Sequence, residues 1–275
     1  MRYIAMCSGG KDSVCSILLA LINKEPLDTI IFSEVMFDLK NNISGEDPDH
    51  IRFVKETLKP YFEQRGIEFL ILRADKDYLD EFYHIIKNPR TDMSHKDKKH
   101  GFAVQGRCLI KRDLKLKPIE KYLKMVRKTD EIRQYIGIAI DEKPRLVSMH
   151  KSIENISLLE KYGYTEEMAL NLCKEYNLLS PIYSLKNDLG GNQRRNGCWM
   201  CMNAKAWEHR KIRKDYPEAW KKFVSLEDED NLAYDKWSVF QGQTLKEREH
   251  ILAEEETFND SYFVKSDGQL SLKIS

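Results

Sequence analysis

The sequence has no long hydrophobic run, and this absence excludes one large class of proteins. No apolar stretch reaches the roughly 18 residues that a membrane-spanning helix needs. The apolar start at residues 3–7 is interrupted at once by SGGKD, so we expect no signal peptide. We therefore expect a cytoplasmic protein with no membrane partner.

Cysteine is scarce as well, since the chain of 275 residues has six. In a chain expected inside the cell, so few cysteines argue against a disulfide framework and favour a metal site or a reactive thiol. A hydrophobic content of 41% and a charged content of 32% are ordinary for a globular protein and exclude a disordered chain. The length allows one large α/β domain, or a domain with a smaller appendage.

The chain also lacks an excess of charge of either sign, since its formal net charge is +1. The charged residues are, however, unevenly distributed along the sequence. Lysine and arginine outnumber the acidic residues in two segments, 87–128 and 205–222. Solvated helices with charged faces would explain these segments, and so would a basic surface for a polyanion such as a nucleic acid. Both interpretations stay open.

Short apolar runs alternate with amphipathic stretches in the first half of the chain. We expect strands at 2–7, 28–37, 68–75 and 134–141, and helices at 12–23, 48–65 and 117–128. This alternation predicts βαβ units, and hence an α/β fold with a twisted, parallel, Rossmann-like sheet and helices on both faces.

The pattern changes to short helices after about residue 150, with helices expected at 152–163, 165–177 and 203–224. The first of these is expected to start at a serine N-cap, Ser152. We therefore expect two parts: an α/β domain at 1–150, and a helical, cysteine-containing region at 151–275.

The segment SGGKDS follows a predicted strand and opens a predicted helix. Adjacent glycines let successive backbone N–H groups point into one concavity, and the helix N-terminus favours an anion. The lysine adds a positive charge and the serines add hydroxyl donors. The pattern predicts a phosphate or pyrophosphate site made of Ser8, Gly9, Gly10, Lys11, Asp12 and Ser13.

The usual P-loop is excluded, because its first glycine corresponds to Ala5 and its Ser/Thr position to Asp12. A dinucleotide fingerprint is excluded because no third glycine follows at the right place. SGGKDS instead resembles the PP-loop of the ATP pyrophosphatase superfamily, in its PAPS reductase-like branch. The segments GRCLIKRDLKLKPIEKYL, YIGIAIDEKPR and NGCWMC are similar to further segments of that branch.

This resemblance implies a fold of the adenine nucleotide alpha-hydrolase type and chemistry at the α-phosphorus of ATP. The protein would bind ATP and Mg²⁺, adenylate an acceptor that the sequence does not identify, and release pyrophosphate, with sulfur transfer as a coupled step. In the implied site, Lys11, Asp12, Arg107 and Lys115 are catalytic, Phe37 and Asp38 lie near adenine or ribose, Asp141 and Glu142 hold Mg²⁺, and Arg145 pairs with a phosphate.

The cysteines outside the first helix predict a metal or cluster site. A CxxC motif follows a glycine turn at 197, and two further cysteines would complete a four-thiolate set for zinc or a [4Fe–4S] cluster. A redox dithiol and plain structural thiols are the alternatives. Cys7 and Cys15 are expected in the core. The expected metal ligands are Cys108, Cys173, Cys198 and Cys201.

Three other functions stay open. A sulfonucleotide (PAPS/APS) reductase would need a C-terminal catalytic thiol, but no cysteine follows Cys201. A nucleic-acid-modifying enzyme, or a defence component of the DNA phosphorothioation type, would use the basic segments 87–128 and 205–222. A non-catalytic nucleotide sensor would keep the fold and the loop.

Overall fold

The chain forms two compact units, and each is described by itself. The first combines Met1–Leu79 with Leu109–Cys198, and the second combines Asp80–Cys108 with Trp199–Ser275. We call them the sheet unit and the second unit. None of the boundaries between the units lies at the expected residue 150, because the helices at 158–175 pack into the core of the sheet unit. The computed structural model describes residues 1–104, 106, 108–184, 197–237, 243–266 and 269–272.

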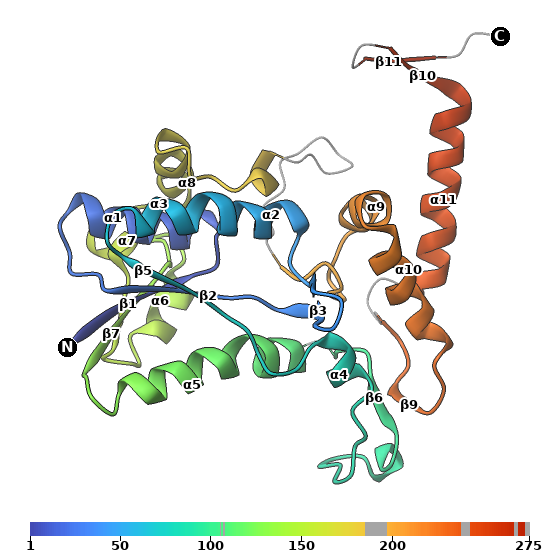
Figure 1. Cartoon of the computed structure of the whole chain (residues 1–275), viewed down its shortest axis with the longest axis horizontal. Helices are drawn as coiled ribbons and strands as arrows, with labels where there is room; N and C mark the ends of the chain where they lie inside the picture. Colours follow the sequence, from blue (N-terminus) through green and yellow to red (C-terminus); the bar gives the residue numbers. More distant parts are fainter. Residues whose placement is uncertain (105, 107, 185–196, 238–242, 267–268, 273–275) are drawn as a thin grey trace. The chain divides into compact units, whose positions relative to one another are not determined.

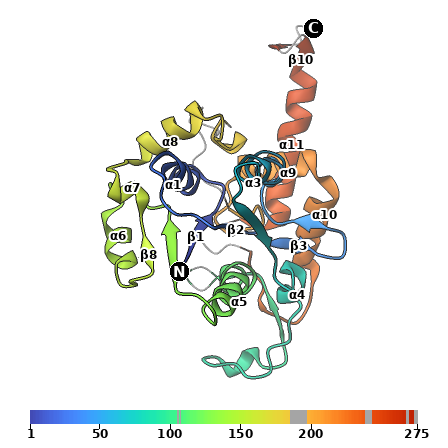
Figure 2. The same ribbon diagram turned by 60° about the vertical axis from the view of Figure 1, so that its left-hand side comes forward.

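The sheet unit is built on a five-stranded parallel sheet with the strand order β5-β2-β1-β7-β8 (Figures 1 and 2). This confirms the expected α/β fold with a parallel, Rossmann-like sheet. The run expected as one strand at 28–37 forms two strands, β2 and β3. β3 leaves the parallel sheet and pairs with β4 in a separate antiparallel pair. The strands are β1 (Arg2–Cys7), β2 (Thr29–Ser33), β3 (Met36–Asp38), β4 (Ile43–Ser44), β5 (Glu68–Leu72), β7 (Ile132–Ile136) and β8 (Asn155–Ile156).

Helices cover both faces of this sheet, as expected from the alternating pattern (Figures 1 and 2). Within β1, Ala5 and Cys7 face a core that α1, α3 and α8 complete, while Ile4 faces α5 on the other side. The helical segments are α1 (Lys11–Ile22), α2 (Pro48–Phe53), η1 (Val54–Leu58), α3 (Lys59–Glu63), η3 (Ile110–Leu116), α5 (Lys117–Val126), α6 (Lys143–Met149), α7 (Leu158–Lys161), α8 (Glu166–Glu175) and η4 (Pro181–Ser184).

The stretch at 152–163 differs from the expected single helix. Asn155 and Ile156 pair with β7 as an edge strand, and α7 begins only after Ser157. The hydroxyl of Ser157 accepts the amide of Glu160 at 3.1 Å, as an N-cap residue does. The expected start at Ser152 was therefore wrong, because the true cap is the second serine of SIENIS.

In its described residues, the second unit has short helices, the 18-residue helix α11 and two small strand pairs. β6 and β9 are parallel, and β10 and β11 are antiparallel. Within the described parts of the chain, no helix is both long and apolar enough to cross a membrane. The elements are η2 (Met93–His95), β6 (Lys99–Gly101), α9 (Ala206–Asp215), α10 (Pro217–Ser225), η5 (Leu226–Asp228), β9 (Leu232–Tyr234), α11 (Leu245–Tyr262), β10 (Phe263–Ser266) and β11 (Gln269–Leu272), while α4 (Tyr78–Phe82) crosses the unit boundary.

Candidate functional site

The SGGKDS loop follows β1 at the point where the strand order of the sheet reverses. β2 and β5 lie on one side of β1, and β7 and β8 lie on the other. In open α/β sheets, ligands bind in the crevice outside the carboxyl ends of the strands at such a switch point. A pocket of about 770 Å³ lies there in the sheet unit. Of the residues expected in the site, it is lined by Ser8, Gly10, Lys11, Asp12, Ser13, Asp141, Glu142 and Arg145.

The loop itself is a tight turn that opens α1. Gly9 has a φ of +71°, and a Cβ at this position would lie 2.7 Å from Cε1 of His50, so glycine is required for two reasons. Ser13 links the turn internally, because its hydroxyl accepts the amide of Ser8 at 3.1 Å and donates to the carbonyl of Gly10 at 2.9 Å. The turn therefore places the first turn of α1, whose amides lack intrahelical acceptors, beside the pocket, where the amide of Lys11 donates to the hydroxyl of Tyr183 at 3.1 Å.

Lys11 lies among acidic side chains. Its Nζ donates to Asp12 at 2.7 Å and to Glu166 at 2.9 Å. Burial by itself lowers the pKa of this lysine, but the hydrogen bonds to the two carboxylates outweigh that effect and raise it. Lys11 is therefore a stable positive charge within the pocket.

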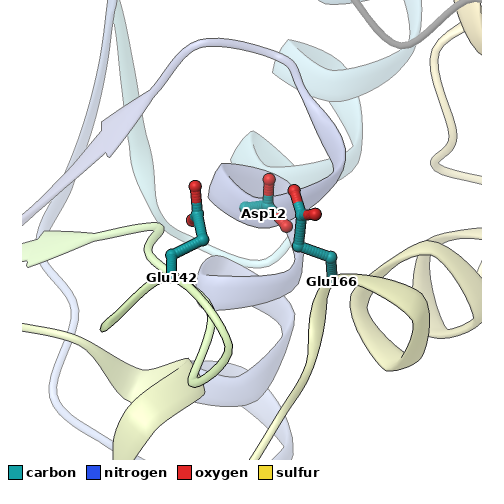
Figure 3. Close-up of side chains that lie close together, drawn as sticks. All are labelled: Asp12, Glu142 and Glu166. Carbon is teal, nitrogen blue, oxygen red and sulfur yellow. The ribbon is translucent and has the colours of Figure 1, made fainter. Parts of the chain in front are cut away.

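Three carboxylates of the pocket lie close together, each from a different element (Figure 3). Asp12 lies in the first turn of α1, Glu142 is the N-cap of α6, and Glu166 opens α8. One oxygen of each lies within 4.8 Å of the others. Burial raises the pKa of Asp12, and the charges of Glu166 and Glu142 raise it further. We call Asp12, Glu142 and Glu166 the acidic cluster.

The acidic cluster includes half of the expected Mg²⁺ pair. Glu142 belongs to it, but the carboxylate of Asp141 accepts the backbone amide of Glu166, the first residue of α8, at 3.2 Å. The carboxylates nearest to Glu142 are those of Asp12 and Glu166, while Asp141 lines the same pocket, and the expected Mg²⁺ pair stays a prediction. Arg145, the expected phosphate residue, lines the same pocket and is paired with Glu142.

Other expected residues do not line this pocket. Phe37 is fully buried and stacks on Tyr78 at 5.6 Å between ring centroids. Asp38 accepts the backbone and side-chain amides of Asn41. Lys115 lies 3.3 Å from the buried Glu46, which is the main cause that raises the pKa of this lysine. Arg107 lies outside the described residues.

The expected four-cysteine set is divided between the two units. Cys173 and Cys198 belong to the sheet unit, while Cys108 and Cys201 belong to the second unit. Cys173 is fully buried, and its thiol donates to the carbonyl of Lys11 at 3.2 Å. Burial raises the pKa of this thiol. The metal site stays a prediction.

The remaining cysteines behave as expected of core residues. Cys7 and Cys15 are both buried in the core of the sheet unit. Burial raises the pKa of Cys7 to about 11 and that of Cys15 to about 12. Neither thiol ionises at neutral pH.

Part of the charge in the basic segments is engaged within each unit. In the sheet unit, Arg112 and Lys117 both pair with Asp113 and lower the pKa of that carboxyl to about 2. In the second unit, Arg210 and Arg213 pair with Glu255 and Glu249 of α11. Nucleic-acid binding through segments 87–128 and 205–222 stays a prediction.

Sequence reasoning missed several residues of the pocket. Glu166 follows a threonine cap and gave only a helix-start signal, and Tyr183 lies in SPIY, a segment that suggested no role for its tyrosine. Gly137 was also missed, although a glycine inside a predicted strand, here 134–141, is a signal for close backbone approach, and so was His50, which contacts the loop without lining the pocket. His50 was hidden inside a helical pattern, at 48–65, that indicates only burial.

His50 gives the fold a pH-dependent contact with the loop. Its Nε2 lies 2.9 Å from the carbonyl of Ser8, and its Nδ1 lies 2.8 Å from the hydroxyl of Ser180. Burial lowers the pKa of His50 below its usual value of 6.5, so the folded protein holds the neutral ring. The resulting stabilisation is complete above pH 6.5 and is lost as the pH falls below that value toward the lower folded pKa.

We expect the free energy of unfolding to fall by about 1 kcal/mol per pH unit below pH 6.5 because of His50 alone. Urea unfolding of wild type and His50→Gln between pH 5 and 7.5 gives the free energy of unfolding of each protein at each pH. The contribution of His50 is the difference between the slopes of these two free energies against pH. Equal slopes for the two proteins would show that His50 is not the titrating group.

A search with protein-family models found no match to this chain, and no curated protein matches it either.

Proposed function

We propose that this protein binds ATP with a divalent cation at the carboxyl end of β1 and transfers its adenylyl group to an acceptor, with release of pyrophosphate. The observation that carries the proposal is the meeting of three features in one pocket. These features are the SGGKDS turn with the first amides of α1, the half-buried cation Lys11, and the acidic cluster.

The donor set of the acidic cluster fits a divalent cation. Carboxylate oxygens are the ligands that Mg²⁺ prefers, and Asp12, Glu142 and Glu166 bring one each within 4.8 Å of the others. Burial is the main cause that raises the pKa of Asp12, and the charges of Glu166 and Glu142 act in the same direction, so a cation beside these carboxylates would favour the ionised form of Asp12. A cation bound there would balance these carboxylates and the charge of a triphosphate.

The positive side chains of the pocket are suited to the phosphates. Lys11 is held against Asp12 and Glu166, and Arg145 against Glu142. Phosphate oxygens are stronger partners for both groups than a surface ion pair, and guanidinium groups bind them in a bidentate manner. Together with the amides of α1, they would hold the pyrophosphate while the acceptor attacks the α-phosphorus.

In the reaction, the acceptor forms a bond to the α-phosphorus as the bond from that phosphorus to the bridging oxygen breaks. Negative charge develops on the departing pyrophosphate. Donors that are already oriented toward it stabilise that charge without reorganisation, which is the largest contribution an enzyme makes in such transfers. The acceptor and its coupling to sulfur chemistry remain part of the proposal.

Lys11→Met is expected to weaken binding of ATP at least about tenfold, because it removes a charge-assisted hydrogen bond to phosphate. Isothermal titration with Mg²⁺ and ATP measures the loss. Lys151→Met removes an exposed lysine outside the pocket and serves as the control. Equal affinity of Lys11→Met and wild type would contradict the assignment of the loop.

The site of cleavage tests the chemistry separately from binding. ATP turnover by the full chain should release pyrophosphate and leave the label of [α-³²P]ATP on AMP or on an adenylated product. Release of orthophosphate with labelled ADP would show γ-phosphoryl transfer and overturn the proposed reaction.

A further inference from the structure

A phenol lies at the first amide of α1, supplied by a segment far from the loop in sequence. η4 brings Tyr183 to the pocket, where the backbone amide of Lys11 donates to its hydroxyl oxygen at 3.1 Å. The side chain is 9% exposed. Among the hydrogen bonds of the described residues, none gives the phenol's own proton an acceptor. Tyr183 therefore carries a buried donor that is not used within the described chain and that borders the pocket.

The hydroxyl of Tyr183 is suited to donate a hydrogen bond to a ligand. Burial raises the pKa of Tyr183, and the nearby charge of Asp12 raises it further, so the phenol stays protonated at neutral pH. Its oxygen already accepts an amide at the positive end of a helix, and such an accepted bond strengthens the O–H as a donor. The carboxylates nearby are occupied by Lys11 and Arg145. An anionic oxygen at the N-terminus of α1 is the acceptor that fits.

Two residues hold the phenol in this position. The backbone amide of Tyr183 donates to the carbonyl of Ser180 at 3.1 Å, and the hydroxyl of Ser180 lies 2.8 Å from Nδ1 of His50. The carbonyl of Ser8 can only accept, so Nε2 of His50 carries the proton and Nδ1 accepts from Ser180. The hydrogen bonds that run from Ser8 through His50 and Ser180 to Tyr183 thus form a closed ring with the loop, because Tyr183 in turn accepts the amide of Lys11. A donor that is fixed before binding loses little conformational entropy when the ligand binds.

We propose that Tyr183 binds a phosphate group of the nucleotide through its phenol O–H, and that Ser180 and His50 are its positioning residues. The proposal rests on the proposed function, because the ligand is the triphosphate of the same pocket. It adds a phosphate donor from the segment at 178–184 to the donors of SGGKDS.

Tyr183→Phe tests the proposal, since it removes the hydroxyl and keeps the ring. We expect about a tenfold loss of affinity for ATP and for inorganic pyrophosphate, both titrated with Mg²⁺, and no change for adenosine. Tyr135→Phe is the matched control: this tyrosine is 1% exposed in the same unit, donates to the carbonyl of Pro26, and does not line the pocket. It should cost stability and leave both affinities unchanged.

The positioning role has its own readout. Ser180→Ala should weaken pyrophosphate binding in wild type but have no further effect in Tyr183→Phe, and Ser180→Thr should restore binding because it returns a hydroxyl. Losses that add in the double variant would show that Ser180 acts independently of Tyr183 and overturn its role.

The outcomes also separate this inference from the proposed function. If wild type binds ATP and pyrophosphate and Tyr183→Phe binds them equally well, the role of Tyr183 is wrong and the proposed function stands. If wild type binds neither compound, the proposed function fails and the role of Tyr183 fails with it.

Discussion

Replacing Gly137 with alanine is expected to abolish measurable ATP binding and to destabilise the sheet unit by about 2 kcal/mol or more. Gly137 directly follows β7 and lines the pocket. A Cβ at this position would lie 2.5 Å from the backbone nitrogen of Ser13 and 2.6 Å from the carbonyl carbon of Asp12. These are backbone atoms of the first turn of α1, so the clash can be relieved only if the turn or the strand moves.

The expected loss of binding follows from which atoms must move. The amides of that turn are the proposed phosphate donors, and a displacement of about 1 Å at such a site is enough for a hundredfold loss of function. Titration with Mg²⁺ and ATP measures the affinity, and urea unfolding measures the stability.

Gly163→Ala is the matched control for the Gly137 variant. Gly163 has a φ of +72°, but a Cβ there would meet nothing within 4 Å. The substitution should cost about 1 kcal/mol of backbone strain and leave ATP affinity unchanged. If Gly137→Ala binds ATP as well as wild type, the close approach of β7 to α1 is not needed for the site.

The second large effect is expected from removing two charges of the acidic cluster. Glu142→Gln combined with Glu166→Gln should weaken binding of Mn²⁺, used as a probe for Mg²⁺, by about 100-fold, because two of three carboxylates lose their charge at nearly constant shape. Electron paramagnetic resonance of free Mn²⁺ measures this loss directly.

Glu167→Gln provides the control within the same pocket. Glu167 lines it, but lies outside the acidic cluster, so its amide variant should bind Mn²⁺ nearly as wild type does. The double variant should also bind pyrophosphate better than wild type when no metal is present, since two like charges that repel the ligand are gone. Unchanged Mn²⁺ affinity in the double variant would show that the acidic cluster is not the cation site.

The sequence was most informative where local pattern and tertiary structure agree. The alternation of short apolar runs and amphipathic stretches predicted β1, α1, β2, β5, α5 and β7, and the parallel sheet follows from them. The strand β8 was missed because two residues are too few to produce an alternating pattern. The division expected at residue 150 differs from that of the structure. The sequence changes there from strands to short helices, but the helices at 158–175 pack into the same hydrophobic core as the strands.

By itself, the sequence determined that a turn with a lysine links a strand to a helix, and that it differs from a P-loop. It also placed Glu142 and Arg145 after a strand whose carboxyl end lies at the same edge of a parallel sheet, since that edge is common to all its strands. The structure adds the reason for the first glycine of this turn: Gly9 has a positive φ, and a Cβ there would clash with His50.

Only the tertiary structure decided which side chains complete the pocket. Glu166 and Tyr183 reach Lys11 because α8 packs along α1 and η4 follows it, and His50 reaches the loop from α2. These contacts join positions more than 40 residues apart in the chain. Their geometry is set by how helices pack on one another and on the sheet, and the spacing of residues along the chain does not encode it.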